Sequence, residues 1–148
     1  MKNKKYVIGL PIALILGFGF YAFAQRTSVP PRVKASFEKK FPQVKKVSWG
    51  KESDKEWEAE FQMNGTEYSA NFLEDGAWKE TEREIKKKDI PDNVLATLNT
   101  QFPEYNIDEV ELVENPNGSQ YEIALEKGKE EMEVLIGTDG QLIKTIDE

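Results

Sequence analysis

Glutamate is the residue type in this 148-residue sequence whose spacing could do chemistry. In three stretches it recurs two or four positions apart, which places its carboxyl groups on one side of an extended chain. Carboxylates can act as general acids or bases, hold a metal ion, or bind a cationic group. The residues with this spacing are Glu56, Glu58, Glu60, Glu122, Glu126, Glu131 and Glu133.

The other groups that catalysis needs are missing from the composition. The chain contains no histidine and no cysteine, which removes the commonest general base and the thiol nucleophile. The G-x-S-x-G, Walker and G-x-G-x-x-G motifs are absent from the sequence too. A catalytic acid needs a buried pocket that raises its pKa, whereas these alternating glutamates are expected on an exposed face. The sequence therefore predicts no enzyme activity, no catalytic residue and no cofactor.

A calcium site is another role that acidic residues can serve. Asp139-Gly140 lies close in sequence to Glu130, Glu131 and Glu133. It does not fall in the D-x-D-x-D-G pattern of a calcium loop, and Asp-Gly is a common hairpin turn. The prediction is a turn, with no metal ligands.

The charge balance argues against one class of binding partner. The chain has 20 basic and 27 acidic residues, for a net charge of −7. A nucleic-acid binder needs a basic footprint, so nucleic acid is not expected as a partner. Residues 25–88 carry a charge of +2 and residues 89–148 a charge of −12. This asymmetry marks either a partner-facing side or an ordinary solvated surface.

The amino terminus has the pattern of a secretory signal. A short lysine-rich start precedes the apolar run from Tyr6 to Tyr21, and Ala22-Phe23-Ala24 supplies the small residues of a cleavage site. The prediction is a signal peptide over residues 1–24, cleaved between Ala24 and Gln25, and a periplasmic or secreted mature chain of net charge −10. Retention of this segment as a membrane anchor is the alternative.

A degenerate internal repeat organises the rest of the chain. Five positions beginning at Pro30 match five beginning at Pro91 with a constant offset of 61, and later positions match at 63 and 64. The first set is Pro30, Val33, Phe37, Phe41 and Pro42, and the second is Pro91, Val94, Leu98, Phe102 and Pro103. The pattern predicts two tandem units, residues 25–88 and 89–148, that together form one compact domain.

Each unit reads as one helix followed by four strands. Apolar residues at i, i+4 and i+8 predict a helix of about three turns, and the prolines are typical of its start and its end. Period-two alternation from Val47 to Trp78 predicts strands, with turns at Asn64-Gly65 and Asp75-Gly76. The expected fold is α+β, with antiparallel meander sheets covered by helices on one face. Whether the two units share one continuous sheet stays open.

The motifs also resemble a known family. VPPRVKASFEKKFP, WEAEF and NGTEYSANFLEDG are similar to the PepSY-like domain, which is itself described as similar to beta-lactamase-inhibitor protein and is frequent in secreted proteins of Bacteroidetes-type bacteria. The resemblance implies tandem helix-plus-four-strand repeats that form a curved sheet, with helices on its convex side. It also implies a concave face that inhibitors of this fold use to grip an enzyme.

The expected function is binding. We interpret the chain as an exported, non-enzymatic module that recognises a protein or peptide, a cationic one included, through its sheet face and hairpin loops. The seven glutamates above are its candidate contact surface. One alternative is an inhibitor of a secreted or periplasmic hydrolase, such as a beta-lactamase or peptidase. Another is a sensor of a small ligand or cation.

Overall fold

The structure, a computed structural model, describes residues 28–147 as two α-helices, one short 3-10 helix and eight strands. In chain order these are α1 (Pro31–Lys40), β1 (Val47–Ser53), β2 (Glu56–Met63), β3 (Thr66–Leu73), β4 (Trp78–Glu84), η1 (Lys87–Asp89), α2 (Asp92–Gln101), β5 (Asn106–Asn115), β6 (Gly118–Lys127), β7 (Glu130–Gly137) and β8 (Leu142–Asp147). The predicted signal segment lies outside the described residues. Within them, neither α-helix has the length and apolarity needed to cross a bilayer.

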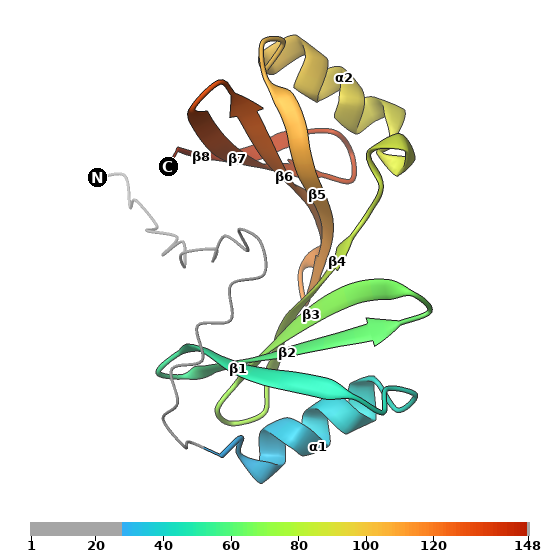
Figure 1. The fold of residues 1–148 in the computed structure, drawn as a ribbon, viewed down its shortest axis with the longest axis vertical. Coiled ribbons are helices and arrows are strands. Elements are labelled where there is room, and N and C mark those ends of the chain that lie inside the picture. Colours follow the sequence, from blue (N-terminus) through green and yellow to red (C-terminus); the bar gives the residue numbers. More distant parts are fainter. Residues whose placement is uncertain (1–27, 148) are drawn as a thin grey trace, which may run out of the picture.

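All eight strands form one antiparallel sheet in which the spatial order follows the chain order. The central contact pairs β4 with β5, residues 81–84 against 111–114, so the sheet is continuous. The question left open by the sequence is thereby answered. In Figure 1 the sheet curves strongly, and α1 and α2 lie on its outer side at opposite ends of the molecule. The opposite face, called the concave face below, lines the hollow between the two ends.

Each helix covers one end of the sheet with a separate core. Val33 and Phe37 are the buried residues of α1, and Val94 and Leu98 are those of α2. Phe37 packs against the rings of Phe41, Trp49, Phe61 and Phe72, with centroid separations of 5.3, 5.3, 5.2 and 6.2 Å. The predicted helical stripe is confirmed.

Each helix ends just before its Phe-Pro pair. Phe41 follows the last residue of α1 and Phe102 the last residue of α2, and each amide still donates to the carbonyl four residues earlier. Pro42 and Pro103 come next, and a proline disfavours helical geometry in the residue before it. The chain therefore leaves the helix while the phenylalanine ring stays packed on the core.

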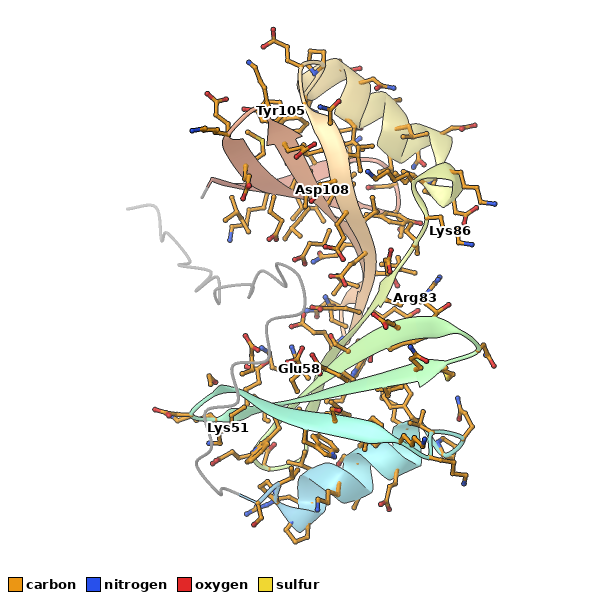
Figure 2. All side chains as sticks on the ribbon, viewed as in Figure 1. Lys51, Glu58, Arg83, Lys86, Tyr105 and Asp108 are labelled. Atoms are coloured by element: carbon orange, nitrogen blue, oxygen red, sulfur yellow. The ribbon has the colours of Figure 1, made fainter. Side chains whose placement is uncertain are left out.

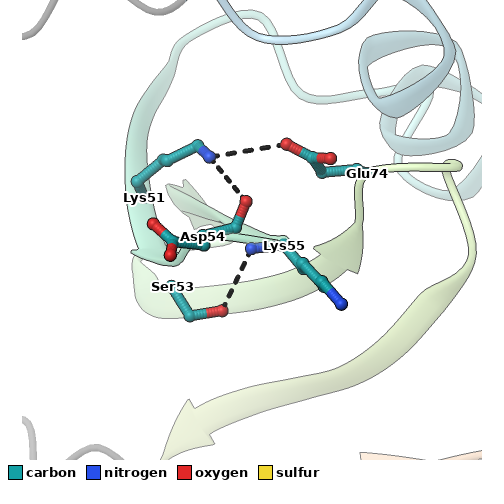
Figure 3. Close-up of polar contacts among 5 residues, drawn as sticks. All are labelled: Lys51, Ser53, Asp54, Lys55 and Glu74. Carbon is teal, nitrogen blue, oxygen red and sulfur yellow. Dashed lines mark hydrogen bonds and ion pairs between the residues drawn. The ribbon is translucent and has the colours of Figure 1, made fainter.

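Turn chemistry fixes the hairpins. Asn64 and Gly65 both have positive φ, 55° and 80°, as a type I′ turn requires. At the opposite end of these strands, Lys51 Nζ donates to the carbonyl of Asp54 at 2.8 Å and pairs with Glu74 at 3.4 Å (Figure 3). This lysine thus joins the β1–β2 turn to the β3–β4 turn.

Gly76 of the β3–β4 turn should tolerate substitution poorly. Its φ is 89°, and a Cβ there would lie 2.9 Å from both the Arg32 carbonyl oxygen and the Ser36 Oγ of α1. We expect Gly76→Ala to lower the free energy of unfolding by about 1–3 kcal/mol in urea titrations, from backbone strain and the clash together. Gly65→Ala is the control, since Gly65 has a similar φ but open space around it. Equal losses in both variants would show that the turn does not pack on α1.

Candidate functional site

The concave face carries the seven glutamates singled out in the sequence. Trp57, Ala59 and Phe61 point to the α1 core, so the residues between them on β2 point the other way. Figure 2 shows Glu58 on this side of the sheet, away from α1. The same alternation places the predicted glutamates of β6 and β7 on the concave face of the second half.

Further acids lie on this face that the sequence interpretation missed. Strict alternation from Trp78 would turn the acids of β4 toward the helices. Between Asn71 and Phe72 the register of β3 shifts against β4. Lys79 therefore has no paired residue on β3, and Thr81 points toward the helix side of the sheet. The acids gained in this way are Glu80, Glu82 and Glu84, and Glu109 and Glu111 of β5 lie beside them. Their own period-two spacing was the signal that could have found them.

The concave face is less exposed than the sequence predicts. Glu56 and Glu133 are only 4% and 2% exposed, which corrects the expectation that these two acids lie on an exposed face. Glu82, which the sequence interpretation missed, is 8% exposed. On the concave side of a curved sheet (Figure 1) the ends of side chains from neighbouring strands converge, so long side chains cover one another. Leu135 is also buried on the same face. Glu60, Glu126 and Glu131 do lie in solvent.

Few cations compensate these carboxyl groups. Lys79 makes an ion pair of 2.6 Å with Glu56 and a longer one of 4.0 Å with Glu80. Ser69 Oγ donates to Glu82 at 3.1 Å. Among residues 28–147, no ion pair reaches Glu58 or Glu82.

Burial and mutual repulsion therefore raise carboxyl pKa values across the centre of the sheet. The pKa of Glu82 rises to about 8, first through burial and then through Glu111 and Glu80. Burial, then neighbouring carboxylates, raises the pKa of Glu58 and that of Glu111 to about 7. The centre of the face holds protons near neutral pH that an exposed carboxylate would have lost.

Glu122 and Glu133 form a carboxyl pair further along the face. Their side chains hydrogen-bond to each other, which requires that one of the two is protonated. Burial, followed by repulsion from Glu133 and Glu82, raises the pKa of Glu122. This pair resembles the shared-proton arrangement of like charges held close together.

A groove of about 800 Å³ runs along one end of the concave face. One wall is acidic, and Lys45 and Lys46 of the α1–β1 loop lie on the other. A smaller hollow of about 270 Å³ continues it toward Lys86 and Lys87. The acids of the groove are Glu60, Glu67, Glu84, Glu109 and Glu111, and its apolar contacts are Val44, Val47, Phe61 and Tyr68.

The chemistry of this surface is that of recognition. An apolar strip bordered by uncompensated carboxyl groups suits an extended polypeptide that carries positive charge. Among the described residues, no group of three or more acidic side chains has the arrangement to hold a metal ion.

Comparisons with known proteins agree with this architecture. A DUF2874 family protein from Bacteroides ovatus superposes with a TM-score of 0.74 at 23% identity, over 82% of this chain and 89% of the other. A BLIP-like protein from Bacteroides fragilis gives 0.73 at 19% identity, over 83% and 89%. A protein from Bacteroides eggerthii that is described as periplasmic gives 0.74 at 18% identity, over 82% and 90%.

These solved structures share the fold with this chain. No curated protein matches it. The sequence profile of the family described as beta-lactamase-inhibitor-like, PepSY-like matches residues 55–144. The chain belongs to this PepSY-like family.

Proposed function

We propose that the chain is an exported, non-enzymatic module that binds a protein or peptide on its concave face. The observation that carries the proposal is the uncovered concave sheet, with its acid-walled groove of about 800 Å³. The helices occupy the outer side of the sheet, so the concave face is the large surface that the described fold leaves open (Figure 1). Its charge favours a cationic partner.

The proposed organisation of the chain is a signal peptide followed by two tandem structural units. Residues 1–24 are proposed as the cleaved signal peptide, which places the mature protein in the periplasm or outside the cell. Residues 25–88 and 89–148 are proposed as two copies of one unit, joined through the β4–β5 pairing. A unit of about sixty residues is marginal alone, so sharing a sheet stabilises both.

Charge reversal on the exposed concave acids tests the binding proposal. We expect a variant with lysine at Glu60, Glu126 and Glu131 to capture at least about tenfold less of the partner than the wild type does. The measurement is a quantitative pull-down from the exported fraction of the producing cells. These side chains are exposed, so the variant should fold.

The matched control places lysine at Glu38, Asp89 and Glu114, which are exposed on the helices or the outer face. Both variants change the net charge equally, so a general charge effect would weaken both. Equal capture by the two variants would contradict recognition through the concave face.

Inhibition of a secreted hydrolase is a second candidate, favoured by the fold shared with the BLIP-like protein from Bacteroides fragilis. A beta-lactamase or a peptidase from the same compartment is the proposed target class. Adding the purified protein should then abolish the activity of one enzyme at a one-to-one ratio. Binding without any loss of enzyme activity would leave recognition as the function and remove inhibition.

A further inference from the structure

Near the centre of the concave face lies a buried side-chain oxygen that accepts no hydrogen bond from the described residues. Asn71 of β3 is 8% exposed, and its side-chain carbonyl oxygen is enclosed. Among residues 28–147, no donor lies within hydrogen-bonding distance of this oxygen. A buried acceptor without a donor is costly, which marks the position as one kept for something other than stability.

The neighbours of Asn71 cannot satisfy it as carboxylates. The register places Glu58 of β2 on one side of Asn71 and Glu80 of β4 on the other. Ala70 and Phe72 are buried in the α1 core, so Asn71 points to the concave face. Glu82 lies one alternate position along β4. Ionised carboxylates only accept hydrogen bonds, so in their charged form these neighbours give the Asn71 oxygen no donor, and no hydrogen bond from them reaches it among the described residues.

A cation already binds at the border of this set. Lys79 contacts Glu56 at 2.6 Å and Glu80 at 4.0 Å. Its ammonium group thus engages one edge of the acids, while Glu58 and Glu82 make no ion pair among the described residues. The remaining charge is available to a second cation.

Guided by these contacts, we propose that Asn71, Glu58, Glu80 and Glu82 form a receptor for one arginine or lysine side chain of the partner, here called the Asn71 site. The inference rests on the proposed function. The cationic group supplies the N–H donors that the Asn71 carbonyl lacks, and the three carboxyl groups surround its charge. Ser69 and Glu60, which line the groove, lie beside the site on the same face. The proposed side chain would come from a segment in the groove and extend past Glu60 and Ser69 to reach the site.

The pKa values of two acids of the site agree with this assignment. Burial and repulsion from neighbouring acids raise the pKa values of Glu58 and Glu82 to about 7 and about 8. Without a ligand the acids retain protons, and an arriving cation replaces protons as the neutralising charge.

The experiment titrates N-acetyl-arginine-methylamide into the purified protein and follows backbone amide shifts by NMR. Its neutral counterpart, N-acetyl-citrulline-methylamide, has almost the same shape. We expect saturable shifts around Asn71 with the arginine probe and at least about tenfold weaker binding of the citrulline probe. Equal binding of the two probes would overturn the proposal.

Asn71→Leu separates binding from folding. This variant should bind the arginine probe about tenfold more weakly. Its melting temperature should rise, because the substitution removes a buried acceptor that has no donor. Glu38→Gln, on the exposed side of α1, should change neither quantity. An Asn71→Leu protein with unchanged binding or a lower melting temperature would contradict the Asn71 site.

The two proposals fail differently. A partner whose capture needs the exposed concave acids, combined with probes that show no preference for arginine, would remove the Asn71 site and keep the proposed function. If the arginine probe binds at Asn71 but charge reversal of the exposed concave acids does not reduce capture of the partner, the Asn71 site is kept and the proposed function is removed.

Discussion

Raising the pH from about 5 to about 9 should lower the free energy of unfolding by on the order of 3–5 kcal/mol. The cause is the group of concave carboxyls whose pKa values lie above the ordinary value of 4.5, with Glu82 near 8 and Glu58 and Glu111 near 7. The folded state binds more protons than the unfolded state, so the stabilisation is complete below the unfolded pKa. It is lost as the pH rises through the folded values.

The expected size follows from the linkage between protons and stability. One unit of pKa shift corresponds to about 1.4 kcal/mol, and the summed shifts exceed the figure given above. Solvent screening of the partly exposed acids and their mutual coupling reduce the total. A loss of this size is a large share of the 5–15 kcal/mol, roughly, that stabilises a domain.

Urea unfolding at several pH values measures this dependence, and Glu82→Gln is the informative variant. An amide reproduces the shape of the protonated acid, so this variant should match the wild type near pH 5 and exceed it by on the order of 2–3 kcal/mol near pH 9. Stability that stays level or rises toward alkaline pH would show that the concave acids are solvated after all.

Phe37→Ala should cost about 3–5 kcal/mol. Phe37 is 3% exposed and touches four other rings, so its removal leaves a cavity at the centre of the first core. Thermal or urea unfolding followed by tryptophan fluorescence measures the loss. A cost below about 1 kcal/mol would mean that the helix is not packed on the sheet as described.

Leu98→Ala extends this prediction to the coupling of the two halves. Leu98 is buried in the second core, and all three tryptophans, Trp49, Trp57 and Trp78, belong to the first half. Because the sheet is continuous through β4 and β5, the cavity in the second half should shift the tryptophan signal and the far-ultraviolet circular dichroism signal to the same midpoint. A tryptophan transition that stays at the wild-type midpoint would show that the halves unfold independently.

Local sequence signals predict most of the fold, for physical reasons that can be named. Phe41 and Pro42 end a helix because proline restricts the residue before it. Asn64 and Gly65 reverse the chain because both accept positive φ. The parity of Trp57 and Phe61 follows from the two-residue period of a strand.

The missed features depend on contacts distant in sequence. The period-two spacing of the β4 acids shows that they share a face, but the face is decided by the register shift at Lys79, which no local motif marks. Burial of Glu56, Glu82 and Glu133 arises from the curvature of the joined sheet. The pairing of β4 with β5 is likewise not specified by local sequence, since each strand could instead have formed an unpaired edge of a separate sheet.

The most direct test of recognition through the concave face is a map of crosslinking positions. A photoreactive amino acid at Ser48 or Gln62 would lie exposed on the concave face, and one at Lys34 or Asn99 would lie exposed on the helices. Irradiation in the producing cells should link the same partner protein to Ser48 and Gln62 and leave Lys34 and Asn99 unlinked. A partner linked from the helix positions and absent from the concave ones would contradict the account.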